Sequence, residues 1–416
     1  MNRLLSVTSL TGLLTLLKMC LGFIVGKIIA IYIGPSGVAL LGQLQGIVSI
    51  FNGLANAPAS SGIVRYTSQN FEQGYEKCAP WWRASVVWIL ILSSIAILIA
   101  FVSAQYLSET LLNNADYKWL IILIALFLPL TAIGTMINSI VNGQQQYKRY
   151  VSMGAISVII SNFLMVALIV KFGITGALVS ISLQSSFIGC VMFFLVLKQP
   201  WFLLRNFFGE FSIIEFKAIS GYILMMIASA TLMPLALVAV RKILVINTGW
   251  NAAGEWQAVW KISETYLSIV TMALGTYFLP KLSKLQSQSE YESEIKNAAK
   301  IILPIVGLMA LIIFLIRDAI ISLLFTIDFY GARDYFSVQL IGDFVKIAAW
   351  LFAYPMLSKG KVKLFVSLEI VFAISLVFLC WLLVPVMGVH GANFAYAMNY
   401  LLYFIVVKFN FKKIVN

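Results

Sequence analysis

The sequence predicts an all-α membrane protein with twelve transmembrane helices, built from two copies of one six-helix unit. The first observation is composition: of 416 residues, 61% are hydrophobic and 11% charged, with a mean hydropathy of +0.95. A soluble globular protein is about 45–50% apolar and 25% charged. The second observation is a series of long apolar segments separated by short, mostly basic loops. The third is an internal repeat.

The repeat is visible as a gap-free offset of 215 positions. The offset places Val25-Gly26-Lys27-Ile28 on Val240-Arg241-Lys242-Ile243, Gly34 on Gly249, Val151-Ser152 on Val366-Ser367, and Gly173-Ile174-Thr175-Gly176-Ala177 on Gly388-Val389-His390-Gly391-Ala392. Internal repeats of this size are typical of transporters. Six helices are an even number, so both copies enter the membrane in the same direction. We therefore expect two pseudo-symmetric lobes related by an axis along the membrane normal, with a central cavity between them.

About 20 apolar residues cross the hydrocarbon core, and this length sets the expected helices. Their expected ranges are 4–33, 38–64, 84–106, 119–142, 150–170, 175–197, 218–246, 254–279, 299–324, 335–357, 364–385 and 391–411. The expected division is an N-terminal lobe at 1–205, a cytoplasmic connecting loop at 206–217 and a C-terminal lobe at 218–416.

The loops give an orientation and an explanation for the net charge of +13. Of 29 Lys and Arg residues, 19 lie in the termini and loops on one predicted side, and only Lys118, Lys171 and Arg333 lie on the other. Cytoplasmic loops carry the excess of basic residues, so both termini are expected in the cytoplasm. The basic balance is thereby explained without nucleic acid, and none is expected as a partner. The four scattered cysteines and the single histidine, His390, predict no disulfide framework, metal or cofactor site.

Subtracting the 22 basic residues of the loops and termini leaves seven cations inside the predicted helices, and four clearly intramembrane acids accompany them. They are the cations Lys18, Lys27, Arg241, Lys242, Lys261, Arg317 and Lys346, and the acids Glu264, Asp318, Asp343 and Glu369. A charge near the bilayer centre costs about 2.5–3.5 kcal/mol on insertion scales, so such residues face a bundle interior or a water-filled cavity.

Two interpretations of these charges stay open. Lys261 with Glu264, and Asp343 with Lys346, are spaced i, i+3 and would neutralise each other on one helix face, while the adjacent Arg317 and Asp318 would snorkel to the membrane surface. Asp343, Asp318 and Glu264 are alternatively candidates for carrying a coupling proton, because burial raises the pKa of a carboxyl group. The sequence does not decide between structural pairing and coupling, nor does it identify a coupling ion.

If each of the four acids neutralises one of the seven cations, three positive charges remain in surplus. Lys18 has no acid nearby in sequence, and Lys27 and Lys242 are equivalent positions of the repeat. Ammonium and guanidinium groups bind phosphate well, so a cationic cavity favours an anionic, phosphate-bearing cargo. Lys18, Lys27, Lys242 and Arg241 are the candidates for binding it.

The segments LGFIVGKIIAIYIGPSGVALLGQLQ, WQAVWKISETYLSIV, YFLPKLSKL, LIRDAI and QLIGDFVKIAAWLFAY resemble the Wzx-type flippases of the multidrug/oligosaccharidyl-lipid/polysaccharide exporter superfamily. The similarity is strongest to the enterobacterial O-antigen translocases and the flippases for the enterobacterial common antigen unit. It covers nearly the whole chain and contains no short diagnostic motif. It implies a two-lobed, twelve-helix protein of the bacterial inner membrane. Such a protein moves an undecaprenyl-pyrophosphate-linked oligosaccharide from the cytoplasmic to the periplasmic leaflet.

The resemblance also implies that charged residues of the central cavity take part in transport, here Lys18, Lys27, Lys242, Glu264, Arg317, Asp318, Asp343 and Lys346. An O-antigen polymerase and a chain-length regulator are expected as partners by analogy alone. Two other functions are alternatives. A multidrug or cation antiporter of the same superfamily favours an acidic or aromatic cavity. A membrane-embedded polysaccharide polymerase favours a long extracytoplasmic loop and a catalytic set. The sequence shows a positive surplus and short outer loops.

Overall fold

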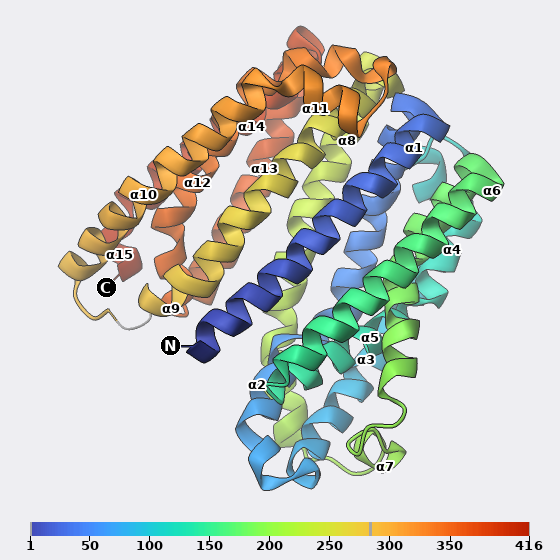
Figure 1. Cartoon of the computed structure of the whole chain (residues 1–416), viewed down its shortest axis with the longest axis vertical. Helices are drawn as coiled ribbons and strands as arrows, with labels where there is room; N and C mark the ends of the chain where they lie inside the picture. Colours follow the sequence, from blue (N-terminus) through green and yellow to red (C-terminus); the bar gives the residue numbers. More distant parts are fainter. Residues whose placement is uncertain (1, 283–284, 416) are drawn as a thin grey trace. The chain divides into compact units, whose positions relative to one another are not determined.

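The computed structural model describes residues 2–282 and 285–415, and over these ranges the regular secondary structure is entirely helical (Figure 1). The α-helices are α1 (Asn2–Asn56), α2 (Ser61–Asn70), α3 (Tyr75–Leu111), α4 (Lys118–Leu126), α5 (Leu128–Gly143), α6 (Tyr147–Val196), α7 (Leu204–Phe207), α8 (Ile213–Ala273), α9 (Leu279–Leu282), α10 (Gln288–Leu315), α11 (Arg317–Leu324), α12 (Phe336–Ser358), α13 (Val362–Met387), α14 (Val389–Phe409) and α15 (Phe411–Val415). Short 3₁₀ turns lie at Ala57–Ala59, Phe71–Gln73, Ala115–Tyr117 and Ile327–Tyr335, and a π turn at Leu274–Phe278. The all-helical prediction is confirmed.

Three of these helices are too long for one membrane crossing. α1, α6 and α8 contain 55, 50 and 61 residues, whereas about 20 residues at 1.5 Å each span the hydrocarbon. Each is broken at a single glycine: Gly34 (φ 69°, ψ −172°), Gly173 (φ 55°, ψ −129°) and Gly249 (φ 83°, ψ 171°). A side chain with a Cβ rarely adopts such a positive φ, so glycine allows the chain to change direction here.

The offset of 215 recurs in the backbone geometry. Gly34 and Gly249 are separated by 215 positions and share one conformation. The break at Gly173 is matched by Gly388 (φ 58°, ψ −138°), which separates α13 from α14. Three residues later, a Cβ on Gly176 would lie 1.9 Å from the carbonyl oxygen of Leu168, and a Cβ on Gly391 2.4 Å from that of Leu383. These equivalent positions require glycine for the same reason.

The turns that follow α5 and α12 are also equivalent. Gln145 and Gly360 both have positive φ, 56° and 66°. Around each, three backbone N–H groups donate to carbonyl oxygens of the preceding helix at positions that differ by 215. The bonds are Gln144 to Ile140, Gln145 to Asn142 and Gln146 to Val141 in the first turn, and Lys359 to Pro355, Gly360 to Leu357 and Lys361 to Met356 in the second. The sequence repeat is therefore a repeat of local structure.

The chain forms two compact units. The N-terminal unit comprises Met1–Ile28 and Gln43–Leu235, and the C-terminal unit comprises Ile29–Gly42 and Ala236–Asn416. Packing thus groups residues 29–42 with the second copy of the repeat and the first part of α8 with the first copy. The predicted boundaries at 205 and 218 divide the chain by its sequence repeat, whereas the two compact units divide it by packing contacts. Within the predicted connecting loop, helix α8 already begins at Ile213.

In the N-terminal unit, α5 packs closely against the second part of α6. A Cβ on Gly134 would lie 2.4 Å from the Cα of Gly189, so the two backbones are nearly in contact. The segment after α6 is held by the indole of Trp82, which lies against the rings of Trp201 and Phe207 and donates a 2.9 Å hydrogen bond to Thr67 Oγ1. This packing leaves the polar face of α5 beside α6.

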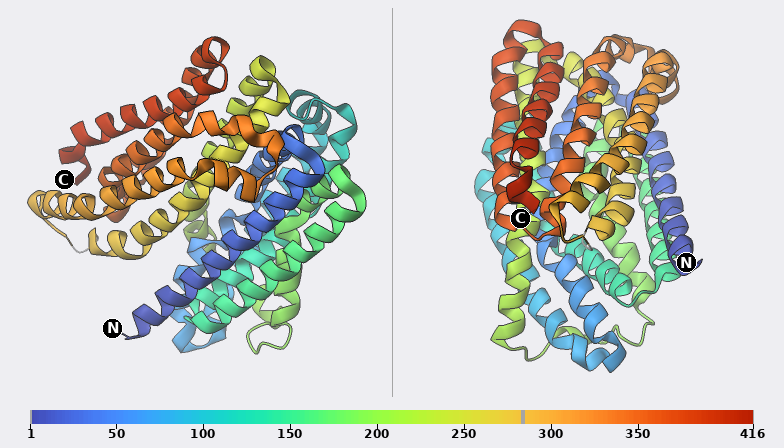
Figure 2. Two further views of the ribbon diagram at one scale, coloured as in Figure 1. Left: turned by 45° about the horizontal axis from the view of Figure 1, so that its top comes forward. Right: turned by 90° about the vertical axis from the view of Figure 1, so that its left-hand side faces the viewer.

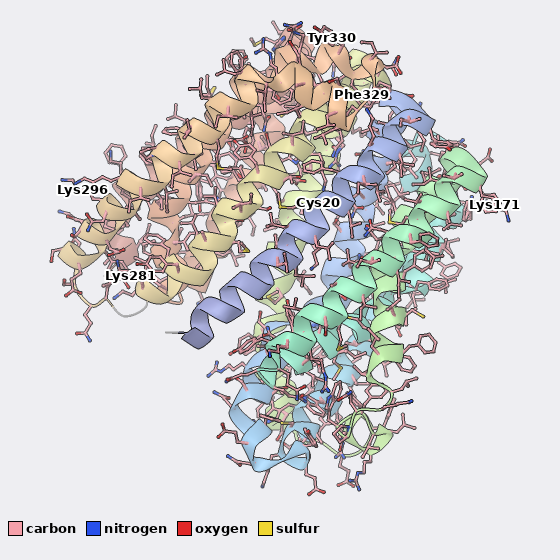
Figure 3. The ribbon with its side chains drawn as sticks, in the orientation of Figure 1. Cys20, Lys171, Lys281, Lys296, Phe329 and Tyr330 are labelled. Carbon is pink, nitrogen blue, oxygen red and sulfur yellow. The ribbon has the colours of Figure 1, made fainter. Side chains whose placement is uncertain are left out.

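In the C-terminal unit, α12 packs against α10, α13 and α14 (Figure 2). Lys281 and Lys296 lie at one end of this bundle, and Phe329 and Tyr330 lie at the other (Figure 3). Lys281 Nζ is 2.7 Å from Glu294 Oε1, which joins the end of α9 to the first turns of α10. One end of the bundle therefore carries loops of the basic class, and the other end carries loops of the class with few Lys and Arg residues.

Several predicted helix boundaries were wrong at prolines and bends. The range 38–64 is interrupted by the 3₁₀ turn containing Pro58, and 119–142 is divided at Phe127, just before α5, whose second residue is Pro129. Proline lacks an N–H and clashes with the preceding turn, so a helix is divided there. The range 299–324 is divided at Ile316, and its first part begins earlier, at Gln288, with a Ser287–Glu290 capping box.

Candidate functional site

The predicted charged residues are distributed unequally between the two units. Lys18 and Lys27 belong to the N-terminal unit, and the other nine belong to the C-terminal unit. Lys27 and Lys242, the repeat-related lysines, are both half-buried and lie one in each unit. Lys18 is an exposed side chain on α1 that lines a cavity of the N-terminal unit. The largest group of buried charges therefore lies in the C-terminal unit.

Asp343 is the most deeply buried of them, with no exposed surface. Its two carboxylate oxygens accept hydrogen bonds from the hydroxyls of Tyr266 and Tyr396, each at 2.8 Å, and the Gln339 amide donates at 3.4 Å. The neighbouring Gly342 makes this possible, because a Cβ there would lie 2.5 Å from the Tyr396 ring. Three donors thus replace water around a carboxylate on α12.

Lys346 lies one turn further along α12 and is surrounded by aromatic rings. Its ammonium is 5.0 Å from the ring centroid of Trp350, 5.2 Å from that of Tyr400 and 5.8 Å from that of Tyr396. No carboxylate oxygen in the described part of the chain lies within 4.0 Å of it. Cation–π contacts of this kind contribute about 0.5–2 kcal/mol each, depending on desolvation.

The expected pairing of Asp343 with Lys346 does not form. The i, i+3 spacing places both side chains on one face of α12, but tyrosine hydroxyls occupy both carboxylate oxygens and the lysine extends among the rings. The carboxylates of Asp343, Glu264 and Glu369 still act on the Lys346 ammonium at longer range. The cluster formed by Glu264, Asp343, Lys346 and Glu369 with Tyr266, Tyr396 and Tyr400 is called the tyrosine–charge cluster below.

Arg241 on α8 is 5% exposed. Its Nε donates a 2.6 Å hydrogen bond to Gln257 Oε1, a contact for which Gly42 leaves room, since a Cβ there would lie 2.8 Å from the Gln257 side chain. Its Nη1 is buried and has no hydrogen-bond partner. Glu264 is its electrostatic partner. A buried guanidinium nitrogen without an acceptor is costly, and it has unused capacity for an anion.

The remaining predicted charges have simpler environments. Lys261 Nζ lies 4.0 Å from Glu264 Oε2, with both side chains largely exposed, so the expected pair forms but contributes little. Arg317 and Asp318 bind elsewhere: Arg317 Nη1 donates to the Phe314 carbonyl oxygen at 2.7 Å and stacks over the Phe314 ring, and Asp318 lies 3.5 Å from Arg333. Because adjacent residues of a helix point in different directions, Arg317 and Asp318 contact different groups and do not pair with each other.

The sequence interpretation missed the aromatic residues. Nothing in the sequence analysis singled out Tyr266, Tyr396, Tyr400 or Trp350, although Tyr396 and Tyr400 are spaced i, i+4, as are Lys346 and Trp350. Trp256, Trp260, Tyr396 and Tyr400 continue as a chain of ring contacts with centroid distances of 5.0–5.2 Å. Within the described residues, no group of three or more His, Cys, Asp or Glu side chains could hold a metal ion.

Comparison with known proteins places the chain in a family. The model of the family described as "Polysaccharide biosynthesis protein" matches residues 4–286, more than half of the sequence. The chain belongs to this family. It is also similar to the lipid III flippases of Escherichia coli (strain K12) and Shigella flexneri, each 28% identical over 399 residues, with 95% of this chain and 94% of the relative covered.

Solved transporter structures share the fold. An inward-facing multidrug resistance MATE family transporter of the MOP superfamily has a TM-score of 0.75 at 16% identity, covering 95% of both chains. The lipid II flippase MurJ in an inward closed conformation has a TM-score of 0.72 at 14% identity, covering 97% of this chain and 89% of the other. A MOP superfamily transporter from Pyrococcus furiosus, described as having reverse polarity of its binding pocket, has a TM-score of 0.64 at 16% identity.

Proposed function

We propose that this protein is a flippase that translocates an undecaprenyl-pyrophosphate-linked oligosaccharide of the O-antigen type from the cytoplasmic to the periplasmic leaflet by alternating access. It acts as a transporter and carries out no covalent chemistry. Membership of the polysaccharide biosynthesis family supports this function, as does similarity to two lipid III flippases over 95% of the chain. The likeness to MATE transporters is a likeness of fold at 16% identity and does not favour drug export.

The proposed architecture has twelve membrane crossings in two six-helix lobes around a central cationic cavity. Eight helical stretches of the described chain are long and apolar enough to cross a membrane. Three of them contain the breaks at Gly34, Gly173 and Gly249 and supply two crossings each, and α14 supplies the twelfth. The protein lies in the bacterial inner membrane with both termini in the cytoplasm, as the distribution of basic loops predicts.

The observation that carries the proposal is the buried, unpartnered Nη1 of Arg241. A pyrophosphate supplies several charged oxygens and would give this nitrogen the acceptor it lacks. Lys242 is the next residue on α8, Lys27 is its repeat equivalent, and Lys18 lies on the same helix as Lys27. Lys261, Arg317 and Lys346 are further candidates for binding the cargo. Glu264, Asp318, Asp343 and Glu369 balance these charges and are the candidates for ion coupling.

The test is restoration of surface polysaccharide in a bacterial strain that lacks its own O-unit flippase. The wild-type chain is expected to restore it, and the double variant Lys27→Ala with Lys242→Ala is expected to lose at least about tenfold of this activity, since each removes a charged donor to phosphate. The matched control is Lys296→Ala with Lys300→Ala, which removes two lysines from the first half of α10. Efflux of a cationic dye without any polysaccharide rescue would contradict the proposal and favour an antiporter.

A further inference from the structure

The N-terminal unit contains a polar cavity of about 430 Å³ that the charge analysis does not explain. Its volume lies within the range of small-molecule binding pockets, about 300–1,000 Å³. It lies between α1, α5 and both parts of α6, and its polar lining residues include Lys18, Asn56, Asn138, Tyr150 and Gln184. One charged group and many amide and hydroxyl groups therefore line it, and no acidic residue does.

These polar groups have unused hydrogen-bonding capacity. Asn56 Oδ1 is buried without a partner. The amides of Asn138 and Gln184, the hydroxyl of Tyr150 and the ammonium of Lys18 make no hydrogen bond or ion pair with any part of the chain that the structure describes. Of these groups, Asn56 Oδ1 is buried, the amides of Asn138 and Gln184 and the hydroxyl of Tyr150 belong to half-buried residues, and Lys18 is exposed. A buried acceptor without a partner is costly, and its convergence on one cavity with several unpartnered donors indicates a polar occupant that satisfies them.

Glycines let the helices that line the cavity approach closely. Gly134, Gly154 and Gly189 line it, and a Cβ would lie 2.4 Å from the Cα of Gly189 if placed on Gly134 and 3.0 Å from the Leu14 side chain if placed on Gly154. At equivalent positions the C-terminal unit carries larger or charged side chains, in three pairs separated by 215: Thr131 and Lys346, Gly154 and Glu369, Ser185 and Tyr400. The cavity and the tyrosine–charge cluster are thus the same place in the two copies, left open in one and filled in the other.

We propose that the cavity of the N-terminal unit binds a sugar residue of the translocated headgroup. A sugar ring presents several hydroxyl groups that both donate and accept, which matches side-chain amides and hydroxyls better than it matches charged groups. Lys18 adds one donor to the same ring. This assignment rests on the proposed flippase function and separates recognition of the saccharide from recognition of the pyrophosphate.

The test compares two lipids binding to the full-length protein in detergent. One is the lipid-linked oligosaccharide that accumulates in the host when this protein is depleted, and the other is undecaprenyl pyrophosphate without sugar. The double variant Asn138→Ala with Gln184→Ala is expected to bind the glycosylated lipid about tenfold more weakly and the bare lipid unchanged, since two hydrogen-bonding side chains are lost. Ser185→Tyr, which introduces the residue found at the equivalent position 400, should give the same selective loss by filling the cavity.

Asn142→Ala is the matched control, because Asn142 lies one turn from Asn138 on α5 and does not line the cavity. Thermal unfolding shows whether each variant is folded. Unchanged binding of both lipids by both cavity variants would overturn the inference and leave the flippase function standing. Equal weakening of both lipids would also overturn it. A wild-type protein that binds neither lipid would contradict the proposed function itself.

Discussion

The two copies of the repeat follow the same backbone through α5–α6 and α12–α14 and differ in the side chains they place there. Gly176 and Gly391 make the same close approach, and the turns at Gln145 and Gly360 have the same hydrogen bonds. On the helix that precedes each of these turns, Leu128 in one copy corresponds to Asp343 in the other. The backbone of the unit is set by a few glycines and turns, which leaves its interior free to become a polar cavity with a single lysine in one copy and a cluster of several charges in the other.

The largest effect is expected from Lys346→Thr, which gives the C-terminal unit the residue found at position 131. It removes the cation held among Trp350, Tyr396 and Tyr400, and with it a positive charge near the carboxylates of Asp343, Glu264 and Glu369. Polysaccharide rescue should fall by more than about tenfold. Lys346→Arg keeps the charge and the ring contacts and should retain most of the activity. Full activity in the threonine variant would show that the two interiors are interchangeable.

Asp343→Leu should follow, with its main effect on stability. It introduces the residue of the equivalent position 128 and leaves the hydroxyls of Tyr266 and Tyr396 without acceptors in a buried site. Each unsatisfied group costs about 1–3 kcal/mol, so the midpoint of thermal unfolding should fall clearly. Asp343→Asn keeps an acceptor oxygen and should lose less. An unchanged midpoint for the leucine variant would mean that the hydroxyls find other partners.

A moderate and equal effect is expected at the matched glycines. Gly173→Ala and Gly388→Ala each place a Cβ on a backbone with φ near 55°, and neither meets a neighbour closer than 3.7 Å. Backbone strain alone therefore applies, about 1–3 kcal/mol per residue, because ψ is −129° at Gly173 and −138° at Gly388, a region that residues with a Cβ rarely adopt at positive φ. Thermal unfolding of the two variants should shift by similar amounts. A large difference between them would show that the local structures are less alike than their dihedral angles indicate.

The smallest effect is expected from Lys281→Ala, at the end of the C-terminal unit away from Phe329 and Tyr330. The hydrogen bond from Lys281 to Glu294 raises the pKa of the lysine, so the contact stabilises the folded state at neutral pH and is lost as the pH rises through that pKa. Because a partly exposed ion pair is screened by salt, the variant should unfold slightly earlier at low ionic strength and show little difference at high ionic strength.

Sequence reasoning identified the features that depend on composition and repetition. Apolar length predicted a helical membrane protein, and the offset of 215 identified Gly34, Gly173 and their equivalents before their dihedral angles were known. It also selected Asp343 and Lys346 as buried charges. It failed on their partners, because spacing along one helix favoured a pair between them, whereas the tyrosine hydroxyls that bind Asp343 come from α8 and α14.

The cavity was missed for a related reason. Asn138 and Gln184 are single polar residues in apolar segments, and Lys18 was assigned to a cationic cargo site without the neutral groups around it. Their convergence depends on α5 and α6 packing through Gly134 and Gly189, a contact between residues 55 positions apart. A search for polar residues on glycine-rich helix faces would have drawn attention to both helices.

If this chain is a flippase, it moves a lipid-linked oligosaccharide across a membrane without other proteins. This is measured as transfer of that lipid between the leaflets of proteoliposomes that contain only the purified protein. We expect transfer by the wild-type chain, loss of transfer in Lys346→Thr and retention in Lys346→Arg. Lipid that stays in its original leaflet, in vesicles where the same protein exchanges a cationic dye for protons, would contradict it.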